Sequence, residues 1–390
     1  MTFEETCGLD KLDSEWADVT TIVPYGFGAD AHRTLKRLFQ DFTIPFIVDQ
    51  DERKWGQTYL GAEIVSPEKL RVLPENAKVV VTIAKRRFHE IRPVMETYGF
   101  REHMDYCHIS QFAQEWYYKY RREYCLFTLD MAMTTACTLN CRHCNMYIPY
   151  HKKPFMLTLA EFQKNLELLM GRIDYVFTLG LLGGEALLNP ELPEMLAYLD
   201  ERYHSRIGQP ILTTNAVRMP SDSLLGILKQ YHVNLVISDY SEAIHARAHA
   251  DELKARADAI GLTCNIMRSR VWTDVGFPDH PWDVPEECAR EHMLQCDPGW
   301  RGLADGKLYF CNCAWSAEQA GLFRVKEGDC LDLASLPAGE EASKQKVLAY
   351  CRGHLPNEYF SFCRVCGGCG EDNQKFVLAA EQTPKKEPTC

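Results

Sequence analysis

The sequence predicts an α/β protein of three segments: a small doubly wound parallel sheet, a run of repeated strand–helix units, and a loop-rich carboxy-terminal segment. Two observations predict this fold class. Apolar strand-like runs alternate with amphipathic helical patterns through the first two segments. Most of the chemically distinctive motifs follow directly on such runs. We place the three domains at residues 1–118, 119–275 and 276–390.

The first segment has the β–turn–α–β order of a parallel doubly wound sheet. Gly26 and Gly28 form its first turn, and Asp49 follows about twenty residues later. This pattern suggests nucleotide binding, in which backbone amides of the turn hold a phosphate and the acid reaches a ribose hydroxyl. A tight turn without a ligand is the alternative. The expected elements are a strand at 18–24, a helix with Leu35, Leu38 and Phe39 on one face, strands at 44–49 and 78–84, a helix at 89–98 and a linking helix at 111–124.

The middle segment repeats the strand–helix alternation, and its first helix opens at a capping box formed by Thr158 and Glu161. Repeated units of this kind suit a parallel barrel, full or partial, with its functional groups at the carboxyl ends of the strands. The expected strands are 126–133, 175–181, 210–214, 234–238 and 262–267.

Composition restricts the function. The formal net charge of −11 argues against a broad nucleic-acid or anionic-membrane surface, since both need clustered Lys and Arg. The acidic start has no apolar stretch, and no run reaches the roughly 18–20 apolar residues of a membrane span, so we expect a cytoplasmic protein. Because the cytosol keeps thiols reduced, the 17 cysteines favour metal or cluster binding over disulfides.

Cys137, Cys141 and Cys144 form the most distinctive motif of the chain. Their spacing lets one loop place three thiolates on one face of an iron–sulfur cube. Because a cube has four irons, one iron stays open for a substrate or cofactor, unlike the four-cysteine clusters of electron carriers. The alternatives are a zinc site completed by His143 and a set of buried, unreactive cysteines.

Glycines and short polar residues follow the later strands. In the run Gly183-Gly184-Glu185, the glycines permit close backbone approach and the acid can pair with a cation. Asn215 ends the third strand of the middle segment and Ser238-Asp239 ends the fourth, where short polar groups suit a ribose. Arg268 lies past the fifth strand and could hold a carboxylate. Ordinary turns, and a surface position for Arg268, are the alternatives.

These motifs together resemble the radical S-adenosylmethionine (radical SAM) superfamily. The resemblance implies a partial (β/α)6 barrel, a [4Fe–4S] cluster on the three cysteines, and SAM chelated at the open iron. One electron then cleaves SAM to a 5′-deoxyadenosyl radical. His143 stands where the family usually has an aromatic residue. The SAM contacts that the resemblance implies are Gly183, Gly184, Glu185, Asn215, Ser238, Asp239 and Arg268.

The carboxy-terminal segment carries a second cysteine pattern. Cys296 and Cys311 flank Gly306, and a later Cys363-x-x-Cys366 follows. This pattern resembles the SPASM/twitch extension of radical SAM enzymes, which implies a β-hairpin and one auxiliary [4Fe–4S] cluster held by those four cysteines. Cys369 competes with Cys366 for the last ligand position. A zinc ribbon is the alternative to an iron–sulfur cluster here. A second auxiliary cluster would have to draw on the scattered Cys288, Cys313, Cys330 and Cys351.

The resemblance predicts an oxidoreductase that takes a hydrogen atom from a sugar, cyclitol or nucleotide-sugar. Loss of a proton and an electron would then oxidise the substrate, whereas return of hydrogen from a thiol would epimerise it. The first hundred residues or so resemble Rossmann-like domains at the front of sugar-modifying enzymes, and a flavodoxin or ferredoxin is the expected reductant. Two alternatives stay open: modification of a peptide or protein, and an iron–sulfur electron carrier or redox sensor. No catalytic base can be named.

Overall fold

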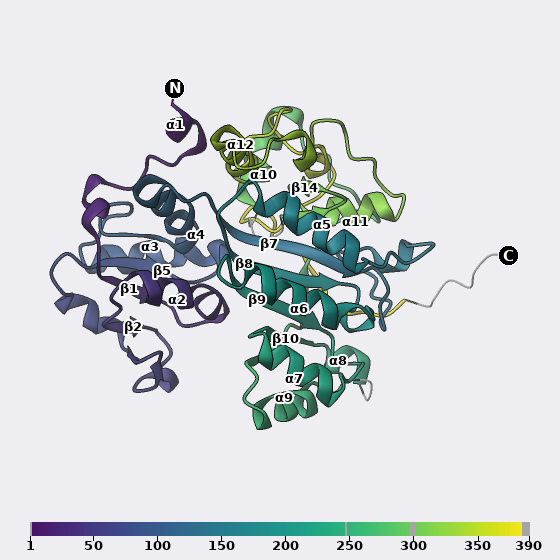
Figure 1. Cartoon of the computed structure of the whole chain (residues 1–390), viewed down its shortest axis with the longest axis horizontal. Helices are drawn as coiled ribbons and strands as arrows, with labels where there is room; N and C mark the ends of the chain where they lie inside the picture. The colour runs from purple at the N-terminus through teal and green to yellow at the C-terminus, as the bar shows by residue number, and fades with distance from the viewer. Residues whose placement is uncertain (1, 246–247, 297–300, 384–390) are drawn as a thin grey trace. The chain divides into compact units, whose positions relative to one another are not determined.

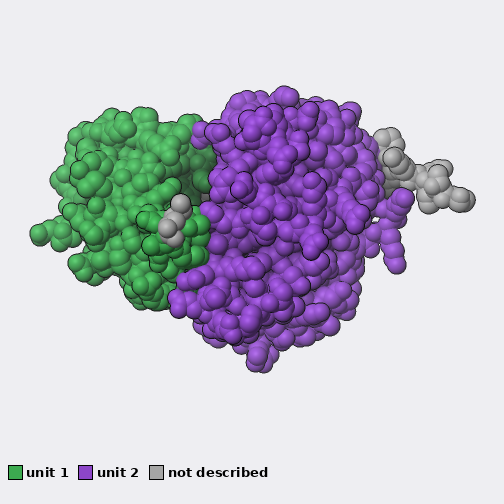
Figure 2. Space-filling model, turned by 90° about the horizontal axis from the view of Figure 1, so that it is seen from above, with its two compact units in different colours: residues 1–127, 173–178 green, residues 128–172, 179–390 purple. Residues whose placement is uncertain are grey.

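A computed structural model describes residues 2–245, 248–296 and 301–383 of the chain. The chain divides into two compact units (Figure 2). The first comprises Met1–Phe127 and Ile173–Thr178, and the second comprises Thr128–Arg172 and Leu179–Cys390. The division into three domains at 118 and 275 stays a prediction.

The first unit is built on a six-stranded sheet. In spatial order its strands are β3 (Thr58–Tyr59), β4 (Ala62–Val65), β2 (Phe46–Val48), β1 (Ile22–Tyr25), β5 (Lys78–Val81) and β6 (Tyr106–His108). All neighbours pair in parallel except β3 and β4. From β1 the chain first adds β2, β4 and β3 on one side, and then adds β5 and β6 on the other side. The strand order therefore reverses between β1 and β5. In sheets of this kind that reversal is where ligands bind.

Helices connect these strands largely as predicted. The amphipathic helix after β1 buries Leu35 and Leu38 completely. The first strand begins at Ile22 and not at residue 18, because a 3-10 helix occupies Ser14–Asp18. The sequence analysis missed β4 and β6, which are short. The helical elements are α1 (Phe3–Cys7), α2 (Ala29–Asp41), α3 (Phe88–Thr97), α4 (Ile109–Gln111), the 3-10 helices η1 (Ser14–Asp18), η2 (Glu52–Lys54), η3 (Pro67–Val72) and η4 (Lys85–Arg87), and the π-helix η5 (Phe112–Arg121).

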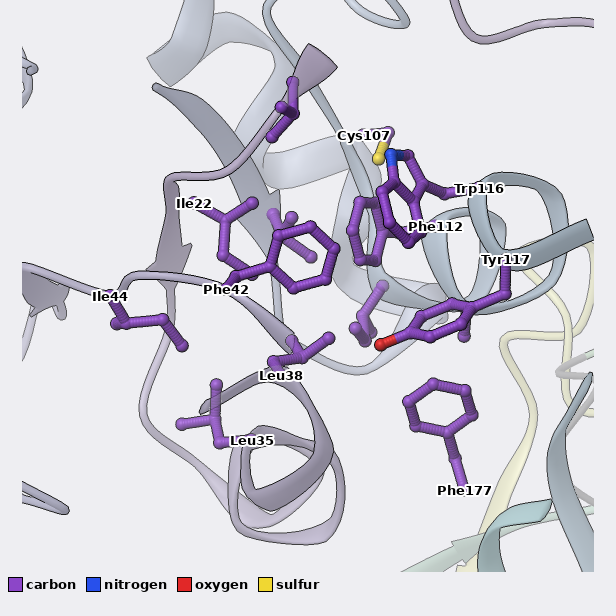
Figure 3. Close-up of a cluster of buried hydrophobic side chains, with 14 of the residues drawn as sticks. Ile22, Leu35, Leu38, Phe42, Ile44, Cys107, Phe112, Trp116, Tyr117 and Phe177 are labelled. Carbon is purple, nitrogen blue, oxygen red and sulfur yellow. The ribbon is translucent and has the colours of Figure 1, made fainter. Parts of the chain in front are cut away.

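Aromatic side chains of η5 form much of the core of the first unit (Figure 3). The rings of Phe112 and Trp116 stack with centroids 5.5 Å apart. Phe42 meets both rings edge-on, at 5.4 and 4.7 Å. Tyr117 is also buried and donates from its hydroxyl to Asp41, at 2.7 Å. The linking helix expected at 111–124 is thus a core element of this unit.

His108, at the end of β6, is a buried neutral histidine. Its Nδ1 accepts a hydrogen bond from the Ser110 amide at 3.1 Å, so the proton lies on Nε2, which donates to the Ile83 carbonyl at 2.8 Å. Burial lowers the pKa of His108 to about 4. Protonation of Nδ1 would turn this acceptor into a second donor facing the Ser110 amide.

The second unit contains most of an eight-stranded sheet. In spatial order its strands are β11 (Cys264–Arg268), β10 (Asn234–Asp239), β9 (Ile207–Thr214), β8 (Tyr175–Gly183), β7 (Cys125–Thr134), β13 (Gly302–Ala304), β14 (Lys307–Tyr309) and β15 (Cys330–Asp332). The pairs β9–β10 and β10–β11 are parallel, and β13 and β14 form an antiparallel hairpin. A separate two-stranded ribbon pairs β12 (Val271–Thr273) with β16 (Phe376–Leu378).

The five strands predicted for the middle segment are confirmed as β7 to β11. The capping box of Thr158 and Glu161 at the start of α5 is also confirmed, and α5 and α6 lie side by side (Figure 1). The main helices are α5 (Leu159–Met170), α6 (Leu192–Tyr203), α7 (Asp222–Gln230), α8 (Ser241–Ile244), α9 (Ala250–Ala259), α10 (Glu286–Gln295), α11 (Asn312–Gln319) and α12 (Glu341–Cys351). The 3-10 helices are η6 (Ile148–Tyr150), η7 (Ala186–Leu188), η10 (Leu333–Ser335) and η11 (Ser361–Arg364).

The sheet of the second unit runs on from β7 into β13, and its edge strands are β11 and β15. It is a mixed α/β arrangement with parallel strands. The partial (β/α)6 barrel and the twitch-like domain stay predictions. None of the helices in the described ranges is both long and apolar enough to cross a membrane.

Candidate functional site

The cysteine loop leaves the carboxyl end of β7, where hydrogen bonds fix the direction of the chain. Thr134 Oγ1 donates to the Phe155 carbonyl at 2.7 Å and accepts from the Ala136 amide at 2.9 Å. Asn189 is buried and donates from Nδ2 to the Met133 carbonyl, also at 2.9 Å. The loop that carries the triad therefore starts from well-anchored backbone.

Gly183 and Gly184 pack directly against this anchored segment. The Gly184 amide donates to the Thr134 carbonyl at 2.7 Å, and the Glu185 amide donates to the Ala136 carbonyl at 2.8 Å. A methyl group on Gly184 would lie 2.2 Å from the Ala136 oxygen, and one on Gly183 would lie 2.1 Å from the Thr134 oxygen. The close backbone approach predicted for these glycines therefore occurs, and its partner in the structure is the start of the cysteine loop.

Glu185 joins this segment to the end of β9. Its carboxylate is fully buried, and it accepts hydrogen bonds from the Asn215 amide at 2.9 Å and from the Leu187 amide at 3.2 Å. Burial raises the pKa of Glu185, and the bond from Asn215 opposes that rise. Each carboxylate oxygen has more than one acceptor position, so these bonds leave capacity for a ligand.

Side-chain amides reach two of the three triad sulfurs. Asn215 Nδ2 donates to Cys137 Sγ at 3.6 Å, and Gln382 Nε2 donates to Cys141 Sγ at 3.2 Å. Hydrogen bonds to cysteine sulfur are one of the means by which proteins tune iron–sulfur clusters. Asn215 was predicted as a site residue, whereas Gln382 was missed because 241 residues separate it from Cys141.

Gln382 belongs to a segment that lies across the triad loop. The Arg142 amide donates to the Glu381 carbonyl at 2.8 Å, and the Thr383 amide donates to the Asn140 carbonyl at 2.9 Å. Asn140 Nδ2 also donates to Thr383 Oγ1, at 2.7 Å. These contacts hold the end of the described chain against the middle of the motif.

The three thiols lie close together in an apolar environment. Burial raises the pKa of Cys137 to about 12, and negative charge on Cys144, Glu185 and Cys141 adds to the rise. Burial also raises the pKa of Cys144. Because only thiolates bind metal, these sulfurs need a strongly positive partner such as the irons of a cluster. Buried Leu139 packs around them.

An ion pair lies at the end of β10. Arg268 Nε donates to Asp239 Oδ2 at 2.9 Å, and the same guanidinium pairs with Asp251, while the SAM contacts of Arg268 and Asp239 stay predictions. Ser238 hydrogen-bonds the hydroxyl of Tyr240. Burial raises the pKa of Tyr240 to about 12, and the nearby Cys141 thiol adds to the rise. Tyr240 is therefore a site residue that the sequence analysis did not select.

The second cysteine group surrounds the predicted hairpin. The hairpin is formed by β13 and β14 with Gly306 in its turn, and Cys311 follows as the N-cap of α11. The pKa of Cys311 is lowered because its sulfur accepts hydrogen bonds from the Cys313 side chain and from the amides of Cys313 and Ala314, although burial opposes this. Helix N-termini favour thiolates in this way, which suits Cys311 as a ligand.

The other predicted ligands lie near Cys311. Burial raises the pKa of Cys363 and of Cys366 well above the usual thiol range. The nearby thiols of Cys296 and Cys311 raise both pKa values further. Cys366 also accepts from the Gly368 amide at 3.4 Å. The structure thus brings the four predicted thiols together. Cys369, the predicted competitor of Cys366, also lies near this group, and so does Cys313, for which the C-x-C spacing at 311 and 313 was the available sequence signal.

Buried donors without an acceptor lie near this thiol group. In the described ranges, Tyr147 OH, Trp282 Nε1 and Asn312 Nδ2 are buried and have no hydrogen-bond partner. Asn312 lies between Cys311 and Cys313 in the chain, and a methyl group on Gly367 would lie 2.5 Å from Trp282 Nε1. Unpaired buried donors are costly, and the sulfurs of an iron–sulfur cluster are acceptors that would satisfy them. The residues therefore fit an auxiliary cluster.

A single metal ion needs its ligands closer together than a cube does, because each thiolate of a cube binds a different iron. In the parts of the chain that the structure describes, no group of three or more His, Cys, Asp or Glu side chains has single-ion spacing. His143, the possible fourth zinc ligand, lies 3.8 Å from Glu381.

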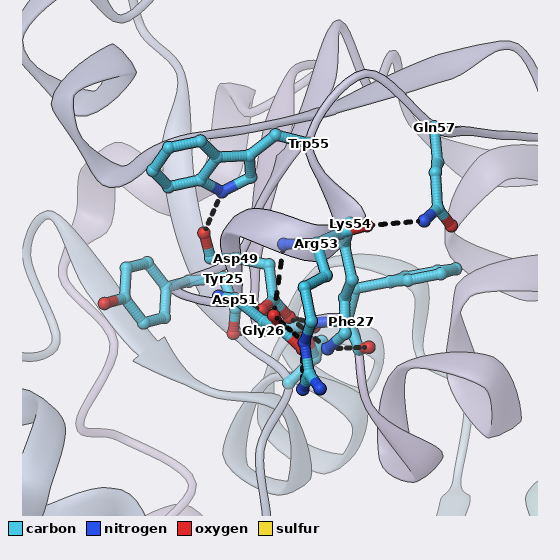
Figure 4. Close-up of polar contacts among 10 residues, drawn as sticks. Tyr25, Gly26, Phe27, Asp49, Asp51, Arg53, Lys54, Trp55 and Gln57 are labelled. Atoms are coloured by element: carbon cyan, nitrogen blue, oxygen red, sulfur yellow. Dashed lines mark hydrogen bonds and ion pairs between the residues drawn. The ribbon is translucent and has the colours of Figure 1, made fainter.

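The turn after β1 has an internal role (Figure 4). Asp49 Oδ2 accepts from the Phe27 amide at 2.6 Å and from Lys54 Nζ at 2.9 Å, and Oδ1 accepts from the Asp51 amide at 2.8 Å. These bonds close the turn, and the ribose contact expected of Asp49 stays a prediction. Gly26, with φ of +102°, is required by the backbone itself.

Comparison with known proteins identifies part of the chain. Residues 131–290 match the model of the radical SAM superfamily. A search of curated proteins gives no match. The structure of BtrN in complex with AdoMet and 2-DOIA is 16% identical over 49% of this chain and 76% of that chain, with a TM-score of 0.36. Native anSMEcpe with bound AdoMet and Kp18Cys peptide is 11% identical over 62% of this chain and 92% of that chain, with a TM-score of 0.37. Streptococcus suis SuiB bound to S-adenosylmethionine is 18% identical over 37% of this chain and 34% of that chain, with a TM-score of 0.28.

The matched residues include the whole triad, the Gly183-Gly184-Glu185 run, and the ends of β9 and β10. This chain therefore carries a radical SAM domain.

Proposed function

We propose that Cys137, Cys141 and Cys144 hold a [4Fe–4S] cluster, and that the chain uses it to cleave SAM and to abstract a hydrogen atom from a sugar, cyclitol or nucleotide-sugar. The observation that carries this proposal is the convergence at the end of β7. Three thiols lie on one anchored loop, and amide donors reach two of them. A loop built in this way leaves the fourth iron of a cube without a protein ligand.

The family implies SAM and one [4Fe–4S] cluster, which together supply the 5′-deoxyadenosyl radical. The protein's own residues bind and orient. Asn215 and Gln382 donate to the thiolates, and Gly184 allows the loop to pack on the next strand. We assign the free acceptor positions of Glu185 to the SAM ammonium, and Asn215 and Ser238 to its ribose and carboxylate. The pairing of Arg268 with Asp239 favours a structural role for these two residues.

We assign Cys296, Cys311, Cys363 and Cys366 to an auxiliary [4Fe–4S] cluster, with Cys369 as the competitor for the last position. The support is their proximity and the unpaired donors beside them. Such a cluster suits an oxidation, in which the substrate radical loses a proton and an electron. Epimerisation is the second outcome, with a thiol returning the hydrogen atom.

Further parts of the proposal rest on composition. The high cysteine content favours a reducing, cytoplasmic setting, and a flavodoxin or ferredoxin would supply the electron. We infer a small-molecule substrate, for which the Rossmann-like pattern of the first unit is the support. Modification of a peptide is the alternative enzyme function, and electron transfer or redox sensing is the alternative without catalysis.

Anaerobic reconstitution tests the cluster assignments. Two [4Fe–4S] clusters bring about eight irons per chain, and reduction with SAM present should release 5′-deoxyadenosine. Cys296→Ala should halve the iron and leave SAM cleavage intact. Cys288→Ala, which changes an exposed cysteine, is the control. A fully loaded protein that releases no 5′-deoxyadenosine would leave only the carrier or sensor function.

Deuterium transfer tests the substrate class. Carbon-deuterated sugars, cyclitols and nucleotide-sugars are offered with SAM, and the 5′-deoxyadenosine is analysed by mass spectrometry. We expect deuterium from one of these classes. Transfer from a Cα- or Cβ-deuterated peptide library, with none from the carbohydrates, would replace this proposal with peptide modification.

A further inference from the structure

Tyr147 lies three residues after the last cysteine of the triad, in an unusual backbone position. Its φ is +50°, in the left-handed region that non-glycine residues seldom adopt. Its amide donates to the Cys144 carbonyl at 2.8 Å, and only 1% of the residue is exposed. Such strain is often found at functional sites, where the surrounding structure holds it in place.

The segment that carries Tyr147 is bound to α11, the helix that follows Cys311. Ser316 Oγ donates to the Met146 carbonyl at 2.6 Å, and His151 Nε2 lies 3.1 Å from the same hydroxyl. These contacts hold the loop of the triad against the element that carries Cys311 and Cys313. The ring of Tyr147 is further held by Phe277, whose centroid lies 5.6 Å away.

The Tyr147 hydroxyl has no hydrogen-bond partner among the described residues, although it is buried. Burial raises its pKa well above the usual range, and the thiols of Cys313, Cys366 and Cys311 add to the rise, followed by that of Cys144. The hydroxyl therefore lies within electrostatic range of sulfurs of both cysteine groups, and most of them belong to the auxiliary group. A buried phenol without a partner is a donor that the sulfurs of a bound cluster could satisfy.

We propose that the Tyr147 hydroxyl donates a hydrogen bond to a sulfur of the auxiliary cluster, and that this bond connects that cluster to the loop of the triad. The inference rests on the auxiliary cluster of the proposed function. Tyr147 acts as a positioning residue. Hydrogen bonds to cluster sulfurs stabilise the reduced, more negative form and so raise the reduction potential.

Redox titration of the full-length, reconstituted protein tests the proposal, with each cluster followed by its EPR signal. The signals are assigned with Cys296→Ala. Tyr147→Phe removes only the hydroxyl, and we expect unchanged iron content and a more negative potential for the auxiliary cluster. Tyr150→Phe is the control, because that hydroxyl lies on the same segment and donates to Asp279. It should leave both potentials unchanged.

A second measurement does not depend on the stability of that variant. With 3-fluorotyrosine at position 147, the fluorine should show magnetic coupling to the reduced auxiliary cluster. Absence of the coupling, or an unchanged auxiliary potential in Tyr147→Phe, overturns the role of Tyr147. Failure of the proposed function looks different, because the parent protein would then hold about four irons and show one cluster signal.

Discussion

Gly184→Ala is the sharpest test of how the cysteine loop is built. The added methyl carbon would lie 2.2 Å from the Ala136 oxygen and 3.0 Å from Cys137 Cβ. Ordinary contacts of such a carbon begin at 3.4 Å, so the backbones must separate by about 1 Å. The oxygen that must move is the one that accepts from the Glu185 amide at 2.8 Å.

The expected cost follows from these contacts. Overpacking a tight site costs about 1–3 kcal/mol, and a lost backbone hydrogen bond costs about 0.5–1.5 kcal/mol. We therefore expect Gly184→Ala to lower the free energy of unfolding by about 2–4 kcal/mol. Because Cys137 lies at the clash, we also expect the variant to lose most of the triad iron while it keeps the auxiliary iron.

Urea unfolding followed by circular dichroism measures the stability, and iron analysis after anaerobic reconstitution measures the cluster. Gly226→Ala in α7 is the matched control, because no atom lies within 4 Å of the added methyl group. There alanine should stabilise the helix by about 0.5–1 kcal/mol. If Gly184→Ala keeps its iron and matches the stability of the parent, the packing account of this loop is wrong.

Three further predictions concern other residues. Gln382→Met removes the amide that donates to Cys141 and should make the potential of the triad cluster more negative in a redox titration, whereas Gln374→Met, an exposed glutamine, should not. Burial lowers the pKa of His108 from 6.5 to about 4, so the folded protein binds this proton at a pH about 2.5 units lower than the unfolded chain does. The unfolded state therefore takes up the proton first, and stability should fall by about 3 kcal/mol as the pH drops from 6.5 to 4. His108→Gln should flatten this part of the urea-midpoint pH profile, and an unchanged slope would contradict the argument. Asn189→Ala leaves the Leu157 carbonyl without its side-chain donor, whereas the Met133 carbonyl keeps the Leu157 amide, and should cost about 1–3 kcal/mol in urea unfolding; a loss below about 0.5 kcal/mol would exclude an anchoring role.

Local patterns were enough to predict much of the fold. The apolar runs that became β7 to β11 are each surrounded by helical periodicity, and the capping box at Thr158 is complete within four residues. The resemblance of the segment around Gly306 to the SPASM/twitch extension implied a hairpin, and β13 and β14 form one there. β4 and β6 escaped prediction because, unlike the equally short β1, β2 and β5, they were not recognised as part of an apolar run.

The residues of the candidate site also differ in how far they could be predicted. The triad thiols and the glycine run could be identified because each set lies within a few consecutive residues of the sequence. Gln382 and Tyr240 were not selected, because they lie near Cys141 only after folding, whereas the C-x-C spacing with Cys311 was available as a signal for Cys313. Arg268 and Asp239 pair with each other in the structure, which their positions in the sequence did not indicate.

The sequence by itself therefore determined the kind of chemistry, because thiolate spacing on one loop sets what that loop can ligate. Only the tertiary structure decided which groups surround those thiolates. A hydrogen-bond donor such as the Gln382 amide acts over about 3 Å, and long-range packing alone brings it within that distance of Cys141. The same packing gave Asp49 internal partners that its sequence position did not indicate.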